Sequence, residues 1–416
     1  MQRPASRIGR YVETAHAGER VRAYIPPPLP PIPPIRIDGL LAKLSAADQA
    51  LGRLDGVTVL LPDKQLFLYM YVRKEAVLSS QIEGTQSTLS DLLRFEAEAQ
   101  QGKPIDDLRE VSNYVDAMMY GLDRLSSLPL SLRLIRDMHA RLLRSGRGQS
   151  KDPGHFRKSQ NWIGGTRPGN ALFVPPPPNE MTASLDNLEK YIHEETSALP
   201  HLIKAGLLHV QFETIHPFLD GNGRLGRLLI TLYLCSHGVL RQPLLYLSLY
   251  FKAHRADYYR LLQEVRENGA WEAWLEFFLE GVAETANQAF DSATRIHTLI
   301  RNHRELISEK AERASSALRV HEAMQTKPFI SAPMAVKSTG LTKPTVNAAL
   351  EQLQALNLVK EITGRRRNRV YAYRAFLDIL NEGGDPLDAM GARRAARASQ
   401  SHKSPSRHTA SANAEE

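Results

Sequence analysis

The segment HPFLDGNGRLGR, residues 216–227, gathers the side chains in this chain that are best suited to chemistry. It combines a histidine, an aspartate, a glycine-rich turn and two arginines. A histidine can take a proton from a hydroxyl near neutral pH. Arginines bind phosphate oxygens through two-pronged contacts. The segment therefore indicates chemistry on a ligand that carries phosphates.

The glycine-rich turn is suited to binding an anion. Gly221, Asn222 and Gly223 form a run in which positive φ costs little. Backbone N–H groups in such a turn can converge on an anion, and we expect a helix to begin near Arg224 with its N-terminal N–H groups at the same place. Arg224 and Arg227 are three residues apart, on adjoining positions of one helical face. Together these features suit a polyphosphate.

The two ionisable residues before the turn complete a site for hydroxyl attack. A carboxylate beside phosphates is unfavourable unless a cation intervenes, and Mg²⁺ commonly takes one or two carboxylates plus phosphate oxygens. Asp220 is therefore the candidate magnesium ligand, and His216 the candidate general base. Each feature alone has an ordinary explanation, as a core histidine, a simple turn or a solvated arginine face. Their joint occurrence favours a site.

The same segment resembles the signature of the Fic family, HxFx(D/E)GNGRxxR, at every defined position. The resemblance extends from about residue 25 to residue 280. It implies a mainly α fold, with a Fic-type helical core and a small β-hairpin flap. It also implies an enzyme that transfers AMP from ATP to a Ser, Thr or Tyr hydroxyl of a target protein and releases pyrophosphate, with ATP as substrate and Mg²⁺ as cofactor.

The resemblance also assigns roles to residues. His216 is then the base, and Asp220 the Mg²⁺ ligand. The residues assigned to ATP are Gln211, His216, Asp220, Gly221, Asn222, Gly223, Arg224, Arg227 and Tyr250. Gln211 has an equally good alternative as an exposed helix residue, and Tyr250 has one as a core aromatic. Residues 161–175 are similar to the flap, whose strand edge would pair with an extended segment of the target.

A second short motif, SSQIEG at residues 79–84, resembles the inhibitory motif (S/T)xxxE(G/N) of Fic proteins. Ser79, Glu83 and Gly84 match it. If Glu83 reaches Arg227, the carboxylate occupies the arginine that would otherwise orient the γ-phosphate. ATP would then bind unproductively, and the enzyme would be autoinhibited. The alternative is an ordinary glutamate at the end of a helix.

The composition favours a soluble protein of the cytoplasm with several domains. The chain has 416 residues, a net charge of +8 and one cysteine. That cysteine count excludes a disulfide framework and a cysteine zinc site. The N-terminus lacks an apolar leader core, and no stretch is long and apolar enough to span a bilayer, so no membrane partner is expected. A homodimer remains open.

The chain divides into five predicted regions. They are a proline-rich arm (1–36), a helical region that carries the inhibitory motif (37–105), the catalytic core (106–305), a winged helix-turn-helix (313–378) and a disordered tail (382–416). The winged region is predicted from a helix, a short helix, a turn at Gly340, a longer helix and two strands around GRRRNR. It has two alternative partners, DNA and protein.

Three functions therefore compete at this point. The first is a protein adenylyltransferase regulated by Glu83. The second is a DNA-binding regulator whose Fic core senses nucleotide. The third is the same fold with another phosphate chemistry, such as phosphoryl transfer, phosphocholine transfer or removal of AMP. The intact signature favours the first.

Overall fold

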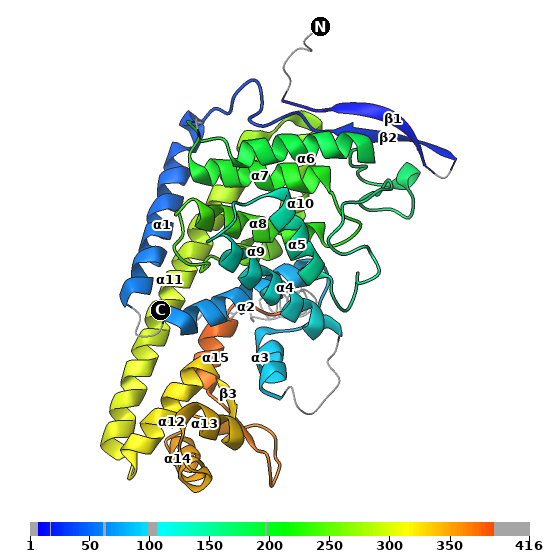
Figure 1. The fold of residues 1–416 in the computed structure, drawn as a ribbon. Coiled ribbons are helices and arrows are strands. Elements are labelled where there is room, and N and C mark those ends of the chain that lie inside the picture. Colours follow the sequence, from blue (N-terminus) through cyan, green and yellow to red (C-terminus); the bar gives the residue numbers. More distant parts are fainter. Residues whose placement is uncertain (1–6, 17, 61–63, 99–105, 196–197, 387–416) are drawn as a thin grey trace, which may run out of the picture.

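The structure is a computed structural model, and it describes residues 7–16, 18–60, 64–98, 106–195 and 198–386. It confirms the mainly α fold (Figure 1). Eleven α-helices of the described residues form the upper body. They are α1 (Leu41–Leu60), α2 (Lys64–Ile82), α3 (Leu89–Glu98), α4 (Asp106–Arg124), α5 (Leu132–Leu142), α6 (Pro178–Ile192), α7 (His201–Ile215), α8 (Asn222–Ser236), α9 (Ser248–Ala253), α10 (Arg255–Asn268) and α11 (Trp271–Lys310).

Helices α7 and α8 form the centre of the upper body. Every residue of α7 from Leu202 to Ile215 is buried, and α8 is buried over most of its length. A helix that is apolar on all sides must be surrounded by other elements. Helices α6, α10 and α11 pack on α7, and α4 and α5 on α8. The signature segment joins α7 to α8, so a buried helix holds it at each end.

The first 36 residues differ from the proline-rich arm that the sequence predicts. Strands β1 (Arg10–His16) and β2 (Glu19–Ile25) form an antiparallel hairpin, with Arg10 opposite Ile25. Two of its buried residues, Val21 and Ala23, pack with Val174 of the predicted flap in a small apolar cluster. Only the part after Ile25 is the irregular proline-rich segment, followed by a short 3₁₀ helix, η1 (Asp38–Leu40).

The predicted flap hairpin, residues 161–175, is reduced to a single antiparallel bridge between Ile163 and Phe173. A 3₁₀ turn, η2 (Pro168–Asn170), occupies its tip, and the prolines from Pro175 onward lack the N–H groups that a longer ladder requires. Tyr24 donates its N–H to the Val174 carbonyl at 2.9 Å, so the hairpin β1–β2 lies beside the flap.

Residues 314–381 form a second, smaller body, which lies below the helical core in the view of Figure 1 and is called the lower body. Its elements are α12 (Ala314–Thr326), β3 (Phe329–Ser331), α13 (Ala332–Thr339), α14 (Lys343–Ala355), β4 (Lys360–Glu361), β5 (Val370–Ala372) and α15 (Arg374–Asn381). The three strands form an antiparallel sheet in the order β3-β5-β4. The helices, the turn at Gly340 and the last two strands occur in the predicted order. The assignment as a winged helix-turn-helix stays a prediction.

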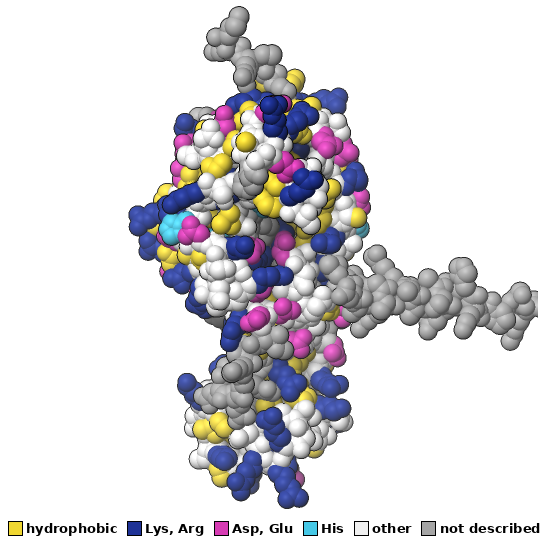
Figure 2. All heavy atoms as spheres, turned by 90° about the vertical axis from the view of Figure 1, so that its right-hand side faces the viewer, with side chains coloured by type: hydrophobic (Ala, Val, Ile, Leu, Met, Phe, Trp, Pro, Cys, Tyr) yellow, Lys and Arg dark blue, Asp and Glu magenta, His cyan; other side chains and the backbone are white. Residues whose placement is uncertain are grey.

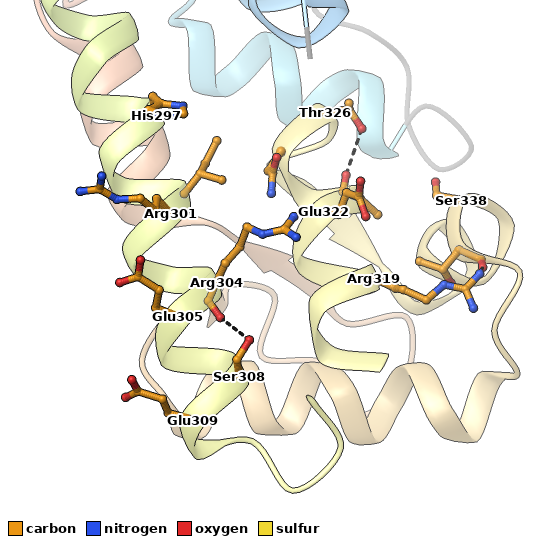
Figure 3. A pocket seen from close by; sticks show the side chains of 14 residues that line it. His297, Arg301, Arg304, Glu305, Ser308, Glu309, Arg319, Glu322, Thr326 and Ser338 are labelled. Carbon is orange, nitrogen blue, oxygen red and sulfur yellow. Dashed lines mark hydrogen bonds between the residues drawn. The ribbon is translucent and has the colours of Figure 1, made fainter. Parts of the chain in front are cut away.

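Helix α11 reaches from the core into the lower body, and a cleft of about 1080 Å³ lies between α11 and α12. The cleft contains both signs of charge, with Arg301 and Arg304 near Glu305 and Glu322 (Figure 3). Residues 382–385, which belong to the predicted disordered tail, contact the helical core through Gln81 and Lys252. Residues 387–416 lie outside the described residues. None of the helices in the described residues has the length and apolar character that a membrane span needs.

Candidate active site

His216 ends helix α7 in a left-handed conformation, with φ of 50°. This conformation is uncommon for a residue other than glycine, and neighbouring side chains must support it. Arg157 donates from Nε to the His216 carbonyl at 2.9 Å, and its backbone N–H donates to the Pro217 carbonyl. Asn161 donates to the carbonyls of His216 and Phe218. Arg157 and Asn161, which lie just before and at the start of the flap, therefore fix the backbone of His216, the predicted general base.

The hydrogen bonds of His216 also set its tautomer. Nδ1 lies 3.4 Å from the Glu213 carbonyl oxygen, which can only accept a hydrogen bond. The proton of the neutral ring therefore belongs on Nδ1, and Nε2 keeps its lone pair. Burial and then the positive charges of Arg266 and Arg157 lower the pKa of His216 to about 3. The ring is thus neutral at pH 7 and able to accept a proton.

Asn222, the first residue of α8, fixes the backbone of the loop between α7 and α8. Asn222 accepts from the Phe218 N–H and donates to the Phe218 carbonyl, both at 2.9 Å. The Phe218 ring stacks on His139 at 3.7 Å between ring centroids. His139 Nδ1 accepts the Gly154 N–H, so its Nε2–H donates to the Asp220 carbonyl at 3.0 Å. Phe218 is fully buried, so its ring anchors the loop in the core.

The candidate anion site is a helix N-terminus and not a three-residue glycine turn. Helix α8 begins at Asn222, two residues before the predicted start, and of the run only Gly221 has positive φ, at 78°. The carbonyl of Gly221 accepts from Leu225, as expected for the first helical turn. The N–H groups of the first turn have no partner within a helix, so they can donate to phosphate oxygens.

Asp220 and Arg224 lie together at this N-terminus. Arg224 NH2 is 3.9 Å from Asp220 Oδ1, and its NH1 donates to Glu110 Oε2 at 3.3 Å. Arg224 and Glu110 are buried, whereas the Asp220 side chain is 35% exposed. Arg147 also donates to Glu110 Oε2, from the opposite loop. The acidic residue of the signature thus presents its carboxylate to solvent, and the arginine behind it is fixed by a buried carboxylate.

Arg227 contacts Ser79 and Glu83, as the sequence predicts. Its NH2 donates to Glu83 Oε1 at 2.7 Å and to the Ser79 carbonyl, and its Nε donates to Ser79 Oγ, both at 2.9 Å. Burial alone would raise the pKa of Glu83, but Arg227 outweighs it and lowers that pKa. An ideal Cβ on Gly223 would lie 2.4 Å from Glu83 Oε1. Glu83 therefore lies directly over the first turn of α8.

Gln211 and Tyr250 contact other parts of the chain and not the signature segment. Gln211 is 3% exposed and donates from Nε2 to the Pro27 carbonyl at 2.7 Å, so it fastens the proline-rich segment to α7. The exposed-glutamine alternative is wrong for this reason. Tyr250 packs against Gly281 and Phe277 of α11, which favours its core alternative. Their contact with nucleotide stays a prediction.

Sequence reasoning missed the residues that support the site. Arg157, Asn161, His139 and Glu110 are far from the signature in sequence, and none of them forms a motif with it. A buried guanidinium that donates to several carbonyls, as Arg157 does, leaves no periodic pattern in the sequence. The described residues contain no group of three or more His, Cys, Asp or Glu side chains suited to a metal.

Comparison with known proteins identifies two stretches of the upper body. Residues 41–123 match the model described as Fic/DOC family N-terminal, and residues 129–234 match the model described as Fic/DOC family. These two stretches of the chain are therefore a Fic/DOC N-terminal domain and a Fic/DOC domain. The Fic/DOC domain contains the whole of α7, the signature loop and most of α8. The N-terminal domain contains Glu83.

Curated relatives have the name "Protein adenylyltransferase Fic". One from Drosophila ananassae is 30% identical over 190 residues, which are 45% of this chain and 35% of the relative. One from Drosophila grimshawi is 32% identical over 168 residues, or 40% of this chain and 32% of the relative. The chain thus spans about a third of the length of these relatives.

Solved structures of Fic proteins are also similar. A Fic family protein from Desulfovibrio desulfuricans G20 has a TM-score of 0.48 at 19% identity, covering 80% of this chain and 95% of that one. Fic-1 from C. elegans has a TM-score of 0.44 at 20% identity, covering 64% of this chain and 76% of that one.

The buried histidines predict that acid destabilises the fold. Burial lowers the pKa of His139 to about 4 and that of His209, His216 and His321 to about 3. In the unfolded chain these groups bind protons below about pH 6.5, and in the folded chain they do not until pH 3–4. Two buried carboxyls with pKa raised to about 7 act in the opposite direction. We expect the free energy of unfolding to fall by roughly 2–4 kcal/mol from pH 6.5 to 5.

Urea unfolding followed by circular dichroism at pH 7.5, 6.5 and 5 measures this change. His321 lies in the lower body. The variant His321→Gln should reduce the change in the free energy of unfolding with pH by the contribution of one histidine. An unfolding midpoint that is equal at pH 5 and pH 7.5 would contradict the prediction.

Proposed function

We propose that this protein is an adenylyltransferase that moves AMP from ATP to a Ser, Thr or Tyr hydroxyl of a target protein. The observation that carries the proposal is the arrangement around α8. A neutral histidine with its lone pair on Nε2 lies at one end of a loop whose other end is a helix N-terminus with Asp220 and Arg224. A base and a polyphosphate site are thus joined by five residues.

In the proposed reaction, the target hydroxyl oxygen attacks the α-phosphorus of ATP. The new bond is between that oxygen and phosphorus, and the bond between the α-phosphorus and the oxygen bridging to the β-phosphate breaks. Pyrophosphate leaves with that electron pair, and the hydroxyl proton passes to His216 Nε2. The first N–H groups of α8 and the Arg224 guanidinium stabilise the charge on the phosphates.

The residues present fit a magnesium ion beside the phosphates. The Asp220 carboxylate is partly exposed at the helix N-terminus, and its Oδ1 accepts the Gly221 N–H at 2.6 Å. When bound, Mg²⁺ would neutralise phosphate charge, with Asp220 as its protein ligand. Asp220 also stays within the electrostatic reach of Arg224, which limits repulsion between this carboxylate and the phosphates.

The contact of Glu83 with Arg227 supports autoinhibition. An arginine that is 2% exposed and already donates to Ser79 and Glu83 has few donors left for a γ-phosphate. The Glu83 carboxylate over Gly223 also places a negative charge beside the first turn of α8. Both effects oppose a productive triphosphate. We infer that α2 must move for full activity.

The flap supports docking of an extended target segment. The hairpin β1–β2 already bonds to Val174, so the target would use the edge of residues 161–164, next to the catalytic loop that Asn161 holds. Main-chain pairing along such an edge needs no particular target sequence. Leu172 on the flap is 80% exposed and offers apolar contact to the target.

Mass spectrometry of the products tests the proposed function. The protein with Glu83→Gly is incubated with ATP, Mg²⁺ and cell lysate, and modified peptides are sequenced. The proposal expects one AMP unit on a hydroxyl side chain of this protein or of a target, with pyrophosphate released in equal amount. A phosphate or phosphocholine adduct, or loss of AMP from a modified target as the only activity, would replace it with another chemistry.

A further inference from the structure

The lower body has a groove of about 380 Å³ with an excess of positive charge. It is lined by the start of α13, one face of α14 and the loop between β4 and β5. Its charged residues are Lys343, Arg366, Arg367, Arg369 and Glu351. Within the part of the chain that the structure describes, no salt bridge holds Lys343, Arg366 or Arg367. Dark blue side chains gather on the lower body in Figure 2.

The loop between β4 and β5 is built to present its arginines. Gly364 and Asn368 both adopt positive φ, at 61° and 55°, so the chain turns sharply on either side of the arginines. Glu361 fixes the start of the loop by accepting from the N–H groups of Thr363 and Gly364. Arg366 and Arg367 remain exposed to solvent.

Helix α14 adds a second source of positive potential. It has 13 residues and begins at Lys343, and the Thr342 side chain caps its N-terminus. Exposed Asn347 lies one turn further along and also lines the groove. An ordered helix end, a lysine and three arginines around one groove match a polyanion with regularly spaced charges.

We propose that this groove binds duplex DNA through its phosphate backbone. Single-stranded nucleic acid is usually held on exposed aromatic rings, and a protein partner on a buried apolar anchor. Among the described residues 314–386 no large hydrophobic side chain is exposed, and Tyr371 of the groove is buried. Charge without a stacking surface or an apolar anchor favours a duplex over both alternatives.

Fluorescence anisotropy of the full chain with a 20-base-pair duplex of arbitrary sequence tests this proposal. Four contacting cations predict a slope of log K against log salt of about −3 to −4. The triple variant R366Q/R367Q/R369Q should make that slope less steep, by about three units. The control R20Q/R22Q/R36Q removes equal charge from exposed arginines of the N-terminal segment and should leave the slope unchanged.

Several results would overturn the proposal. These are no binding by the unaltered chain at 50 mM salt, an equal loss in the two triple variants, or tighter binding of single strands than of the duplex. A protein captured through the same arginines, with no duplex binding, would assign the groove to a protein partner instead.

A separate observation concerns residues 382–385, which follow α15 and lie against the end of α2. We name these residues, with Gln81 and Lys252, the C-terminal clasp. Lys252 donates from Nζ to Gln81 Oε1 at 2.9 Å and to the carbonyls of Gly383 and Asp385, both at 2.8 Å. Gln81 donates from Nε2 to the Gly384 carbonyl at 3.0 Å and to that of Ser87.

The two side chains at the centre of the clasp are buried and hydrogen-bonded. Gln81 and Lys252 are each 1% exposed, and the three donors of the ammonium group have three acceptors. Arg295 of α11 holds the segment from outside through two contacts of 2.7 Å with Glu382. Gly383 adopts φ of 75°, and an ideal Cβ there would lie 2.7 Å from Leu249. A side chain at position 383 would therefore strain the backbone and press on Leu249.

The position of Gln81 links the clasp to the inhibitory motif. Gln81 lies in the last turn of α2, between Ser79 and Glu83, which both contact Arg227. Given the proposed function, we infer that the clasp holds the end of α2 in its inhibitory position and thereby connects the lower body to the nucleotide site. Displacement of residues 382–385 would then release Glu83.

Gly383→Ala strains the clasp at a distance from the catalytic residues. The matched control is Gly238→Ala, since Gly238 also has positive φ, at 67°, but no atom within 4 Å of an added Cβ. Hydrogen exchange of residues 79–86 should speed up by about tenfold in Gly383→Ala and remain unchanged in the control. AMP transfer should rise towards the level of Glu83→Gly. Arg295→Ala provides a second, milder variant.

The outcomes separate the clasp from the proposed function. Unchanged exchange at residues 79–86 in both Gly383→Ala and Arg295→Ala would overturn the clasp. Faster exchange without added transfer, while Glu83→Gly is active, would overturn its link to activity. If Glu83→Gly also transfers no AMP, the proposed function fails, and the exchange data still decide whether the clasp holds α2.

Discussion

His216→Ala is expected to lower the rate of AMP transfer by about 10²–10⁴-fold, which is the range that a general base contributes. The reason is the orientation of the ring. The Glu213 carbonyl fixes the proton on Nδ1, and Nε2 is left to receive the hydroxyl proton. The measurement is the initial rate of incorporation of labelled AMP, compared between Glu83→Gly and the double variant Glu83→Gly/His216→Ala.

Nucleotide affinity distinguishes loss of the base from loss of the site. ATP binding measured by calorimetry should change by less than about threefold, because a base acts in the chemical step and contributes little to ground-state binding. His155→Ala serves as a control, since His155 is an exposed histidine paired with Asp152 in the neighbouring loop. A transfer rate in His216→Ala equal to that of the control would mean that the proton leaves by another route.

The signature segment could be predicted because its chemistry is local. The residues from His216 to Arg227 are consecutive, so their spacing alone brings the base, the carboxylate and the helix N-terminus together. The contact of Glu83 with Arg227 was predicted in a different way, because Glu83 follows the end of α2 and Arg227 lies far along the chain in α8. There the prediction depended on the resemblance to the family and not on the geometry of the sequence.

The remaining features depend on contacts between distant segments. Arg157 supports the left-handed conformation of His216 from a loop almost 60 residues earlier in the chain, and His139 holds the Asp220 carbonyl from α5. The hairpin β1–β2 was missed because the apolar cluster on its buried side is completed by Val174, far along the chain, and not by a neighbouring segment. A short polar hairpin has little sequence signal unless its partner is known.

Glu83→Gly is expected to raise AMP transfer by at least about tenfold. The substitution removes the carboxylate that accepts from Arg227 NH2 at 2.7 Å, and it opens the space above Gly223. A tenfold rise corresponds to about 1.4 kcal/mol, which is less than the cost of separating a buried arginine from its carboxylate. The measurement is self-modification and modification of lysate proteins with labelled ATP.

Two further variants test whether Arg227 is the group that the substitution releases. Ser79→Ala removes the contact of Ser79 Oγ with Arg227 but leaves the Ser79 carbonyl and Glu83 in place, so it should raise transfer less than Glu83→Gly. The double variant Glu83→Gly/Arg227→Ala should lose the gain, because the freed guanidinium would no longer be present to orient the γ-phosphate. If the double variant is as active as Glu83→Gly, Glu83 acts by blocking space above α8, and the ion pair is only its anchor. If Glu83→Gly is no more active than the unaltered chain, the contact is structural and does not inhibit transfer.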